Sequence, residues 1–483
     1  MALFLWLWRG CIMQLRRVMI AAPKSGSGKT MITCALLQAL KNRGEKVLSY
    51  KCGPDYIDPM FHEKALGVPV GNLDTFFTGE EETRRILAGS AKEENIVVME
   101  GVMGLFDGLG GSREEGSSYH LAKVTKTPIV LVADVKGMGV RSMIPLLVGF
   151  LLYDKERLIK GVLLNRISEG YYKTVKTLIE EELQIPVLGF IPETKDLCIE
   201  SRHLGLVMPQ ELNGIKENLQ KMAKRLENTV SVSTIMEIAE SAEELDIDKE
   251  HTEDLYLPEE IALPKDKPVI AVAKDEAFCF YYRENLFLLE KSGAEIKYFS
   301  PIWDQELPPE CHGILLGGGY PELYAEKLSF NHSMHKAIRQ AVESRMPIVA
   351  ECGGFMYLHT SLTDKDGVSY AMAGVIPGKC FYTDRLVRFG YIEIQEEENF
   401  FLSKGKRIKG HEFHYFDSAD NGNGAVAVKP VTSRSYSCIM AGENHWMGFP
   451  HLYYPSNPEF ARSFVEKASQ YKCISGEKGN KLT

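Results

Sequence analysis

Short, almost uninterrupted runs of apolar residues alternate along the chain with stretches of helical periodicity. In the first half, these runs predict strands at 16–22, 46–50, 95–100, 127–134, 160–165 and 185–190. After the first run, residues 29–44 show helical spacing of apolar side chains, and Gly44 is a typical helix stop. Strands that lack polar alternation are typical of a parallel sheet with helices on both faces. The first half therefore predicts an α/β domain.

The same alternation begins again in the second half of the chain, with strands predicted at 268–273, 312–319 and 347–352. Between the halves, residues 237–260 contain eleven acidic residues and one lysine, a composition typical of a solvated helix and linker. We therefore expect two α/β domains joined by an acidic linker, with boundaries at 13–228, 229–266 and 267–473.

Composition and charge narrow the class of protein. A hydrophobic fraction of 45% and a charged fraction of 25% are ordinary for a soluble domain. The net charge of −9 argues against nucleic acid and anionic membranes as partners. Ten cysteines occur without metal-ligand or disulfide spacing, which suits a reducing cytoplasm. The apolar start is shorter than the ~20 residues that cross a bilayer. We interpret Met13 as the start of translation, with an interfacial anchor as the alternative.

The stretch KSGSGKT follows the first predicted strand and opens the first predicted helix, which is the context of a phosphate-binding loop. Backbone N–H groups and the helix dipole of such a loop bind phosphate oxygens. Lys29 is expected to neutralise the phosphates of ATP, and Thr30 to coordinate Mg²⁺. Pro23 replaces the usual first glycine, and Lys24 adds a second lysine. The expected nucleotide-binding residues are Lys24, Ser25, Gly26, Ser27, Gly28, Lys29 and Thr30.

Carboxylates follow two of the predicted strands at the same edge of the sheet. Asp55 and Glu100 come soonest after their strands, so we expect them to bind Mg²⁺ together with Thr30. Asp58 and Asp107 lie further along the loops, where a substrate should enter. An isolated acid at a strand end is often only a helix cap. Several acids beside one phosphate loop favour metal binding instead.

A cysteine in the second half lies in a strand–turn–helix pattern typical of a nucleophile. Cys352 ends a predicted strand and precedes two glycines, and a helix N-terminus there would favour the thiolate. The glycine-rich turn at 317–319 can donate N–H groups to an oxyanion, and His451 follows late in the domain as a general base. The expected catalytic residues are Cys352 and His451, with Gly318, Gly319 and Gly353 at the oxyanion.

In these motifs the chain resembles the cobyrinic acid a,c-diamide synthase family of glutamine-dependent amide ligases. The resemblance covers about Met13 to residue 470, apart from the acidic linker, and rests on stretches that occur in one order. They are KSGSGKT, KCGPDYIDP, MEGVMGLFDG, SRHLGLV, GGGYPELYAEKLSFN, AECGGFMYL, GHEFHYF and HLYYPSNPEFA. The resemblance implies an N-terminal P-loop parallel-sheet domain like that of dethiobiotin synthetase and a C-terminal class I glutamine amidotransferase-like α/β domain.

The resemblance also implies a reaction. Cys352, with His451 as base, would release ammonia from L-glutamine, and ATP with Mg²⁺ would phosphorylate an acetate side chain of the corrinoid. Ammonia would then displace phosphate from the acyl phosphate, at the a and c acetates of cobyrinic acid. Lys24 points to a homodimer, since the leading lysine of related loops often reaches the neighbouring subunit's nucleotide. The implied substrate contacts are Tyr56, Asp58, Asp107 and Arg202.

Two places depart from the family pattern, and other interpretations stay open. Tyr453 stands where class I amidotransferases have a carboxylate, so the group that orients His451 is not identified, and residues 116–123 differ from the usual small-residue pattern. One alternative is the same reaction on nickel-sirohydrochlorin. Cobyric acid synthase fits less well because GPDYIDP and SRHLGLV point to the a,c enzyme. A partitioning-type ATPase with a binding module would share the two-lysine loop but would not need Cys352 and His451 together.

Overall fold

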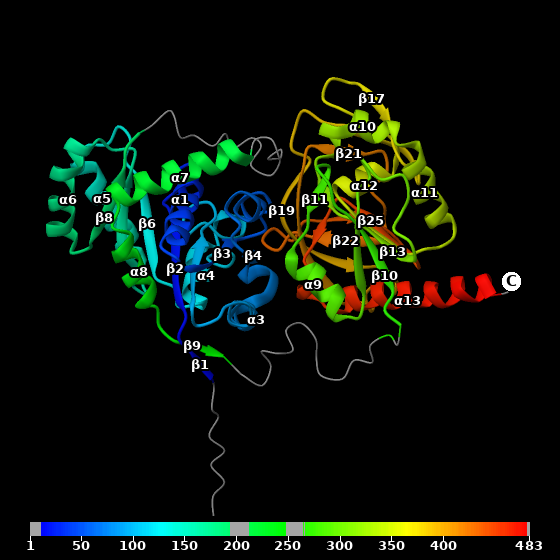
Figure 1. Cartoon of the computed structure of the whole chain (residues 1–483), viewed down its shortest axis with the longest axis horizontal. Coiled ribbons are helices and arrows are strands. Elements are labelled where there is room, and N and C mark those ends of the chain that lie inside the picture. The colour runs from blue at the N-terminus through cyan, green and yellow to red at the C-terminus, as the bar shows by residue number, and fades with distance from the viewer. Residues whose placement is uncertain (1–10, 194–211, 248–263, 265, 481–483) are drawn as a thin grey trace, which may run out of the picture. The chain divides into compact units, whose positions relative to one another are not determined.

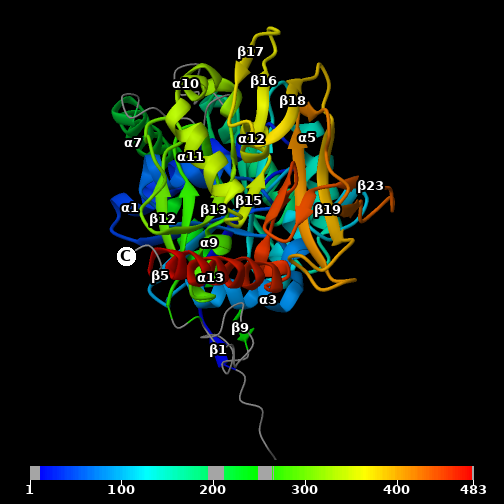
Figure 2. The same cartoon turned by 90° about the vertical axis from the view of Figure 1, so that its right-hand side faces the viewer.

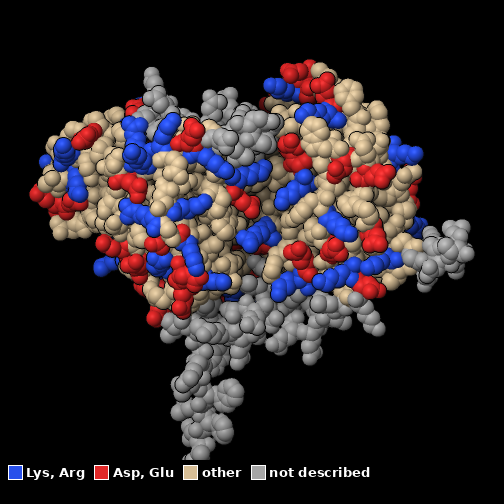
Figure 3. All heavy atoms as spheres, in the orientation of Figure 1, with Lys and Arg blue, Asp and Glu red and all other residues tan. Residues whose placement is uncertain are grey.

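The computed structural model describes residues 11–193, 212–247, 264 and 266–480. The chain divides into two compact units, Met1–Leu255 and Tyr256–Thr483, each with its own main sheet (Figure 1). Within the described ranges, no helix is both long and apolar enough to cross a membrane. On the face drawn in Figure 3, basic and acidic side chains are interspersed on each unit.

The first unit is built on a seven-stranded sheet in which all neighbouring strands are parallel, in the order β4-β3-β5-β2-β6-β7-β8. All six strands predicted from the first half are confirmed. The seventh, β4, escaped prediction because it is a four-residue edge strand that contains Gly71 and Asn72. The bounds are β2 (Arg16–Ala21), β3 (Lys46–Cys52), β4 (Val70–Leu73), β5 (Asn95–Glu100), β6 (Ile129–Asp134), β7 (Ile159–Asn165) and β8 (Val187–Ile191).

Helices cover both faces of this sheet. α1 (Lys29–Asn42) packs against α7 (Leu212–Thr229) and α8 (Val232–Glu240), and these three helices share one apolar core with the strands (Figure 1). α1 ends as predicted, with Gly44 at a φ of 83°. The connections from β4 onward step along the sheet in the direction opposite to that of the connection from β2 to β3. Because crossovers between parallel strands are right-handed, the helices of these later connections lie on the other face of the sheet. These helices are α3 (Thr75–Ser90), α4 (Ser118–Val124), α5 (Val140–Tyr153) and α6 (Glu169–Leu183).

The segment after α7 is folded into the first unit over much of the range expected to form a linker. α8 packs on β2, and β9 (Leu245–Ile247) pairs antiparallel with β1 (Cys11–Met13). Arg17 of β2 is fully buried and donates hydrogen bonds to the backbone carbonyls of Leu15, Thr125, Lys126 and Glu243. The expected linker at 229–266 is therefore structured as far as Ile247.

The second unit contains a six-stranded sheet in the order β12-β10-β13-β15-β25-β24, parallel except for β24. The three strands predicted from the second half are confirmed in it. α13 (Glu459–Asn480) packs on β13 and β10, and Figure 2 shows it crossing the strands. The bounds are β10 (Val269–Ala273), β12 (Glu295–Phe299), β13 (Cys311–Leu316), β15 (Ile348–Glu351), β24 (Met440–Gly442) and β25 (His445–Gly448).

An antiparallel sheet that the sequence did not predict carries the candidate base. Its order is β23-β22-β19-β20-β26, and β20 pairs with β26 so that His411 lies opposite His451. Its bounds are β19 (Arg388–Glu396), β20 (Arg407–His414), β22 (Ala425–Val428), β23 (Ser435–Cys438) and β26 (His451–Leu452).

Smaller elements complete the second unit. β11 (Phe278–Phe280) pairs with β14 (Gly318–Gly319), and a four-stranded sheet has the order β17-β16-β18-β21. The strands of that sheet are β16 (His359–Thr363), β17 (Ser369–Ala371), β18 (Ile376–Tyr382) and β21 (Phe416–Ser418). The remaining helices are α9 (Arg283–Lys291), α10 (Ala325–Phe330), α11 (His332–Glu343), α12 (Gly353–Leu358) and the 3-10 turns η5 (Pro321–Tyr324) and η6 (Tyr454–Ser456).

Candidate active sites

The phosphate loop lies between the end of β2 and the start of α1. Gly26 and Gly28 have φ angles of 74° and 88°, which residues other than glycine rarely adopt. A Cβ atom on Gly28 would also lie 2.5 Å from the Asn165 Nδ2 atom. That amide donates a 2.8 Å hydrogen bond to the Ser27 carbonyl, so the end of β7 fixes the shape of the loop.

The two lysines of the loop have different environments. Lys29 is buried, and its Nζ atom donates to the Met103 carbonyl at 2.5 Å and to the Lys24 carbonyl at 3.4 Å. Burial lowers the pKa of Lys29, and the charge of Lys51 adds to the effect. Lys24 and Ser25 are exposed, which leaves the front of the loop open to a ligand.

Acidic side chains, a lysine and Thr30 meet beside the phosphate loop. The Thr30 Oγ1 atom lies 2.5 Å from Glu100 Oε1 and 3.4 Å from Asp58 Oδ2. Lys51, near the end of β3, donates from Nζ to Asp58 Oδ2 at 2.5 Å and to Glu100 Oε1 at 2.8 Å. Asp55 Oδ2 is 3.9 Å from the same Nζ atom. Every acid of this cluster is predictable from the sequence, but Lys51 was not predicted, although it is a lysine within an otherwise buried strand end.

The acids do not lie in the order that the sequence led us to expect. Asp58 contacts Thr30, although we expected it further from the metal position than Asp55. Asp55 instead accepts a 2.8 Å hydrogen bond from the Ile57 N–H, and its side chain is 31% exposed against 10% for Asp58. The reason is α2 (Ile57–Phe61), whose first turn brings Asp58 back toward β3. Tyr56 is buried directly before this helix.

The loop after β5 packs against the phosphate loop. Asp107 accepts a 2.9 Å hydrogen bond from the Gly104 N–H. A Cβ atom on Gly104 would lie 2.6 Å from the Pro23 carbonyl oxygen, so only glycine fits between the two loops. The Leu105 N–H donates to the Ala22 carbonyl at 2.8 Å. Asp107, an expected substrate contact, is therefore held beside the start of the phosphate loop.

Burial and Lys51 together set the charges of the acidic cluster. Burial raises the pKa of Glu100 to about 7, against the opposing charge of Lys51. Burial also opposes the ionisation of Asp58, but Lys51 outweighs it and lowers the pKa of Asp58. Burial alone would lower the pKa of Lys51, yet Glu100 and Asp58 raise it above its usual value. Lys51 is therefore charged at neutral pH, as the partner of two carboxyl groups.

The cluster fits part of a Mg²⁺ site. Thr30, Asp58 and Glu100 bring oxygen atoms together, and Glu100 Oε2 is buried without a hydrogen-bond partner among the described residues. Within the same residues, no three His, Cys, Asp or Glu side chains form a complete metal site. Because Mg²⁺ usually keeps several waters and binds substrate phosphates, partial coordination by protein suits a metal that arrives with a nucleotide.

Two other stretches were expected to contact the substrate or to depart from the family pattern, namely residues 201–207 and 116–123. Arg202, with the surrounding stretch 201–207, lies outside the described residues. Residues 116–123 contain the N-cap and all but the last residue of α4, and Ser117 accepts a 3.0 Å hydrogen bond from the His120 N–H. The Ser118 Oγ atom accepts from the Val102 N–H at 2.8 Å. The unusual sequence of this stretch thus caps a helix and ties it to the loop after β5.

Cys352 lies in a strained turn between β15 and α12. Its φ and ψ angles are 46° and −103°, a region that residues with side chains rarely adopt. Its N–H donates to the Gly448 carbonyl at 2.8 Å, which holds the turn against the end of β25. A Cβ atom on Gly354 would lie 2.2 Å from the Leu316 carbonyl oxygen. The turn therefore requires glycine after the cysteine, as the nucleophile-elbow pattern predicts.

His451 and the glycine-rich turn adjoin this elbow. A Cβ atom on Gly318 would lie 2.4 Å from His451 Cε1, so the imidazole rests on the backbone of β14. A Cβ atom on Gly353, next to Cys352, would lie 3.1 Å from the Gly319 nitrogen. The structure thus brings together the five residues that the sequence analysis selected for catalysis and for the oxyanion.

Burial leaves the cysteine and histidine neutral. It raises the pKa of the Cys352 thiol above its usual value, and the charge of Glu322 adds to the rise. Burial also lowers the pKa of His451 to about 3, and neighbouring His414 adds to that effect. Burial therefore opposes the thiolate that the helix N-terminus was expected to favour.

Aromatic rings surround His451. The His411 ring stacks on it with centroids 5.0 Å apart and an interplanar angle of 16°. His411 Nδ1 lies 3.2 Å from the Tyr282 hydroxyl oxygen. Tyr453, at the position of the class I carboxylate, is buried with its ring 5.2 Å from that of Tyr282. His411 belongs to the stretch GHEFHYF, from which no role was predicted for it, and the pairing of β20 with β26 places it beside His451.

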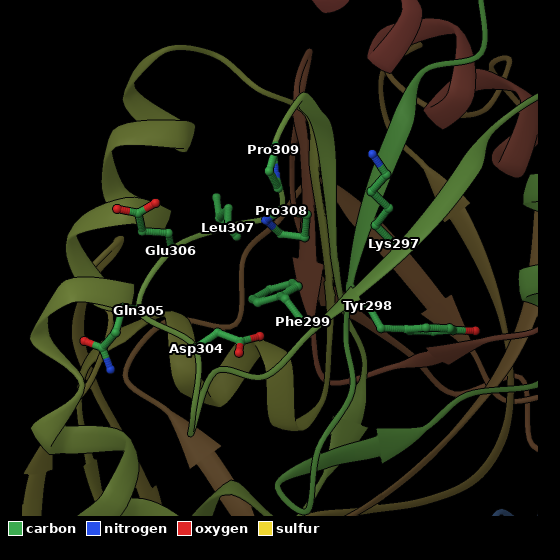
Figure 4. Close-up of a pocket in the computed structure, with 9 residues that line it drawn as sticks. All are labelled: Lys297, Tyr298, Phe299, Asp304, Gln305, Glu306, Leu307, Pro308 and Pro309. Atoms are coloured by element: carbon green, nitrogen blue, oxygen red, sulfur yellow. The ribbon is translucent and has the colours of Figure 1, made fainter.

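A hollow of about 690 Å³ lies at the edge of the main sheet of the second unit (Figure 4). It is lined by residues 297–299 of β12 and 304–309 of the following loop, and none of the predicted site residues lines it. β12 is an edge strand, separated from β15 by β10 and β13. The hollow is therefore distinct from the site around Cys352.

Two family models match the chain. They are the CobQ/CobB/MinD/ParA nucleotide binding domain at residues 18–206 and the CobB/CobQ-like glutamine amidotransferase domain at residues 269–448. The cobyrinate a,c-diamide synthase of Caldanaerobacter subterraneus subsp. tengcongensis is 36% identical over 460 residues, covering 94% of this chain and 99% of that protein. The protein of the same name from Thermoplasma volcanium is 38% identical over 475 residues, covering 95% and 98%. Among solved structures, PurLQS from Thermotoga maritima is 18% identical with a TM-score of 0.31, and the match covers 43% of this chain and 99% of that chain.

Proposed function

The chain belongs to the cobyrinate a,c-diamide synthase family, and from this premise we propose that it amidates the a and c acetate carboxylates of cobyrinic acid. ATP would activate each carboxylate as an acyl phosphate, and glutamine would supply the ammonia, in the synthesis of cobalamin. The relatives match over nearly their whole length, and the two domain families fit the two reactions. A glutamine amidotransferase domain at 269–448 argues against the alternative of an ATPase with a simple binding module.

In the proposed glutaminase reaction, Cys352 is the nucleophile. Its sulfur attacks the side-chain amide carbon of glutamine while His451 accepts the thiol proton, and the oxyanion forms beside the backbone of Gly319 and Gly353. His451 then gives the proton to the amide nitrogen, ammonia leaves, and water hydrolyses the thioester to glutamate. The strained elbow and the contact of His451 with Gly318 support this assignment.

In the proposed synthetase reaction, a carboxylate oxygen of the corrinoid attacks the γ-phosphorus of ATP and ADP leaves. Ammonia then attacks the acyl carbon, and phosphate leaves. Lys29 and the N–H groups of the loop would bind the phosphates. Lys51 donates to Asp58 and Glu100 and is placed to offset negative charge where two anions must approach each other.

The remaining residues of the first unit have supporting roles in this proposal. Thr30, Asp58 and Glu100 would hold Mg²⁺, which neutralises phosphate charge when bound. Asp55, Tyr56, Asp107 and Arg202 are proposed contacts of the macrocycle. The exposed Lys24 is proposed to reach the nucleotide of a second copy in a homodimer.

The observation that carries the proposal is the meeting of Cys352, His451 and the glycine-rich turn in a chain that also has a phosphate loop with its acidic cluster. We expect Cys352→Ala to lose glutamine-dependent amidation of cobyrinic acid and to keep amidation with high ammonium chloride. Diamide formation with ATP and Mg²⁺ would be followed by chromatography for each nitrogen donor. The exposed Cys473 provides a matched control, and Cys473→Ala should behave as the wild type.

The outcomes separate the parts of the proposal. Glutamine-dependent turnover in Cys352→Ala would show that another residue is the nucleophile. A wild-type protein that amidates cobyrinic acid with neither donor would refute the function. Faster amidation of nickel-sirohydrochlorin than of cobyrinic acid under the same conditions would change the assigned macrocycle.

A further inference from the structure

Glu322 lies directly beside the nucleophile elbow and has no role in the reaction described above. It belongs to η5, the turn that follows Gly318 and Gly319. The preceding residue, Pro321, touches the elbow, since a Cβ atom on Gly353 would lie 2.9 Å from Pro321 Cδ. The glycine-rich turn therefore carries a carboxylate as well as N–H groups to the neighbourhood of Cys352.

This carboxylate has no cation beside it in the structure. Across the described ranges, no ion pair or hydrogen bond to another residue's side chain involves Glu322, and its carboxylate accepts a hydrogen bond from its own backbone N–H. Glu322 is partly exposed, although burial raises its pKa to about 7. Glu322 thus places a partly exposed acid on the turn that contacts the nucleophile elbow.

The position of this acid opposes the chemistry of the cysteine unless a cation joins it. The charge of Glu322 is the largest electrostatic contribution to the raised pKa of Cys352, after burial. Glutamine brings such a cation, because its α-ammonium group is on the third carbon from the amide carbon that Cys352 attacks. A single substrate molecule can therefore present its amide to the sulfur and its positive charge to the neighbouring carboxylate.

We propose that Glu322 binds the α-ammonium group of glutamine while the side-chain amide lies at Cys352. The proposal rests on the function proposed above and names the group that recognises the amino acid end of the nitrogen donor. Its consequence is that substrate binding neutralises the acid that opposes thiolate formation. Cys352 then loses its proton to His451 more readily when glutamine is bound than when it is absent.

The test compares two substrates, glutamine and glutaramate, and substitutions at two residues, Glu322 and Glu326. Glutaramate is glutamine without the α-amino group, so it measures the contribution of the ammonium directly. In the full-length protein, Glu322→Gln should raise the KM for glutamine about 10- to 100-fold, the range for a hydrogen bond to a charged group. The wild-type preference for glutamine over glutaramate should disappear in the same variant. Glu326 is exposed on the following helix, and Glu326→Gln should change neither value.

A second readout separates recognition from structural damage. The rate at which iodoacetamide alkylates Cys352 in the absence of glutamine, measured on the peptide that contains it, should rise in Glu322→Gln because a nearby negative charge is removed. A merely damaged site would not gain a more reactive thiol together with a selective loss of glutamine affinity. Glu322→Asp keeps the charge, and should keep the preference for glutamine over glutaramate with a smaller rise in KM.

Two results would overturn this inference. One is a Glu322→Gln variant that still prefers glutamine to glutaramate as strongly as the wild type. The other is an unchanged alkylation rate of Cys352 in that variant. Failure of the proposed function is distinguishable from both, because the wild-type protein would then release no ammonia from glutamine.

Discussion

The Lys51 side chain affects the protonation of both carboxyl groups that it contacts beside the phosphate loop, Asp58 and Glu100. This side chain is only 5% exposed, and its Nζ atom lies 2.5 Å and 2.8 Å from oxygens of Asp58 and Glu100. A buried lysine is stable only when its charge is matched by acids and hydrogen bonds. Here the dependence is mutual, since the same lysine lowers the pKa of Asp58 and opposes the rise of the pKa of Glu100.

We predict that Lys51→Ala reduces amidation by at least ~100-fold with glutamine and with ammonium chloride, since one strong electrostatic contact contributes that much. Two buried carboxylates would remain without their cation, and they would repel both the nucleotide phosphates and the substrate carboxylate. Glutamate release from glutamine should stay near the wild-type rate, because that site is in the other unit. Diamide formation and glutamate release would be measured on the same samples.

The matched control lies on the same strand. Lys46 begins β3, pairs with Glu94 at 3.1 Å and is 68% exposed, so Lys46→Ala should leave both reactions unchanged. Equal amidation rates in the two lysine variants would show that Lys51 only supports the fold of the strand end.

At the scale of elements, β2 depends on contacts made far along the chain. Arg17 lies in this strand and is fully buried, and it donates hydrogen bonds to the backbone carbonyls of residues that precede β2, precede β6 and follow α8. One of them belongs to Glu243, which follows α8. Burial lowers the pKa of Arg17 to about 10, and the charge of Glu243 opposes the change. Arg17 therefore joins the central strand to the segment between α8 and β9.

We predict that Arg17→Met lowers the free energy of unfolding of the first unit by roughly 3 kcal/mol, because several buried carbonyls lose a charged donor. Arg16→Met, on the same strand, should cost less than about 1 kcal/mol, since its ion pair with Glu45 is partly exposed. Urea unfolding followed by far-ultraviolet circular dichroism measures the change. The fluorescence of Trp446, buried in the second unit, should shift at the same urea concentration in all variants. Equal losses in the two variants would contradict the anchoring role of Arg17.

The elements that the sequence predicts best are those whose pattern is local. The buried parallel strands and the helix after the phosphate loop follow from continuous apolar runs and from Gly44. The edge strand β4 does not, because it is short, and β19 and β20 of the antiparallel sheet do not, because they mix buried with more exposed residues instead of forming continuous apolar runs. α8 was assigned to a linker because its acidic neighbours mask the buried face formed by Ile235 and Ile238.

The same limit applies to the candidate sites. Residues next to a glycine turn, such as Thr30 and Cys352, are predictable because the turn itself fixes their place. Asp58 and Lys51 are harder, because their positions depend on the first turn of α2 and on the neighbouring strands. The neutral state of Cys352 was not predictable either, since burial of the folded chain, rather than the sequence around the cysteine, decides it.

At the scale of the whole molecule, the described residues proposed for each half-reaction come from one unit. The phosphate loop, Lys51 and the acids all come from residues of the first unit, whereas Cys352, His451 and the glycine-rich turn come from the second. The groups of the first unit follow strands of one parallel sheet, whereas those of the second unit lie at strands β15, β14 and β26 of three different sheets. A substitution in one set should therefore leave the chemistry of the other largely intact, and this is a property that paired variants can measure.

We predict that Lys29→Ala abolishes amidation with glutamine and with ammonium chloride, while the protein still releases glutamate from glutamine. The ammonium group of Lys29 is buried at the loop, where it is the expected countercharge of the nucleotide phosphates, and alanine supplies neither charge nor hydrogen bonds. Cys352→Ala serves as the reciprocal control, since it should lose glutamate release and keep ammonia-dependent amidation. Nucleotide binding, diamide formation and glutamate release would be measured for both variants. Unchanged ATP-dependent amidation in Lys29→Ala would refute the role of the loop. Loss of glutamate release in the same variant would show that the two half-reactions are coupled through the nucleotide, so that the second unit works only when the first is occupied.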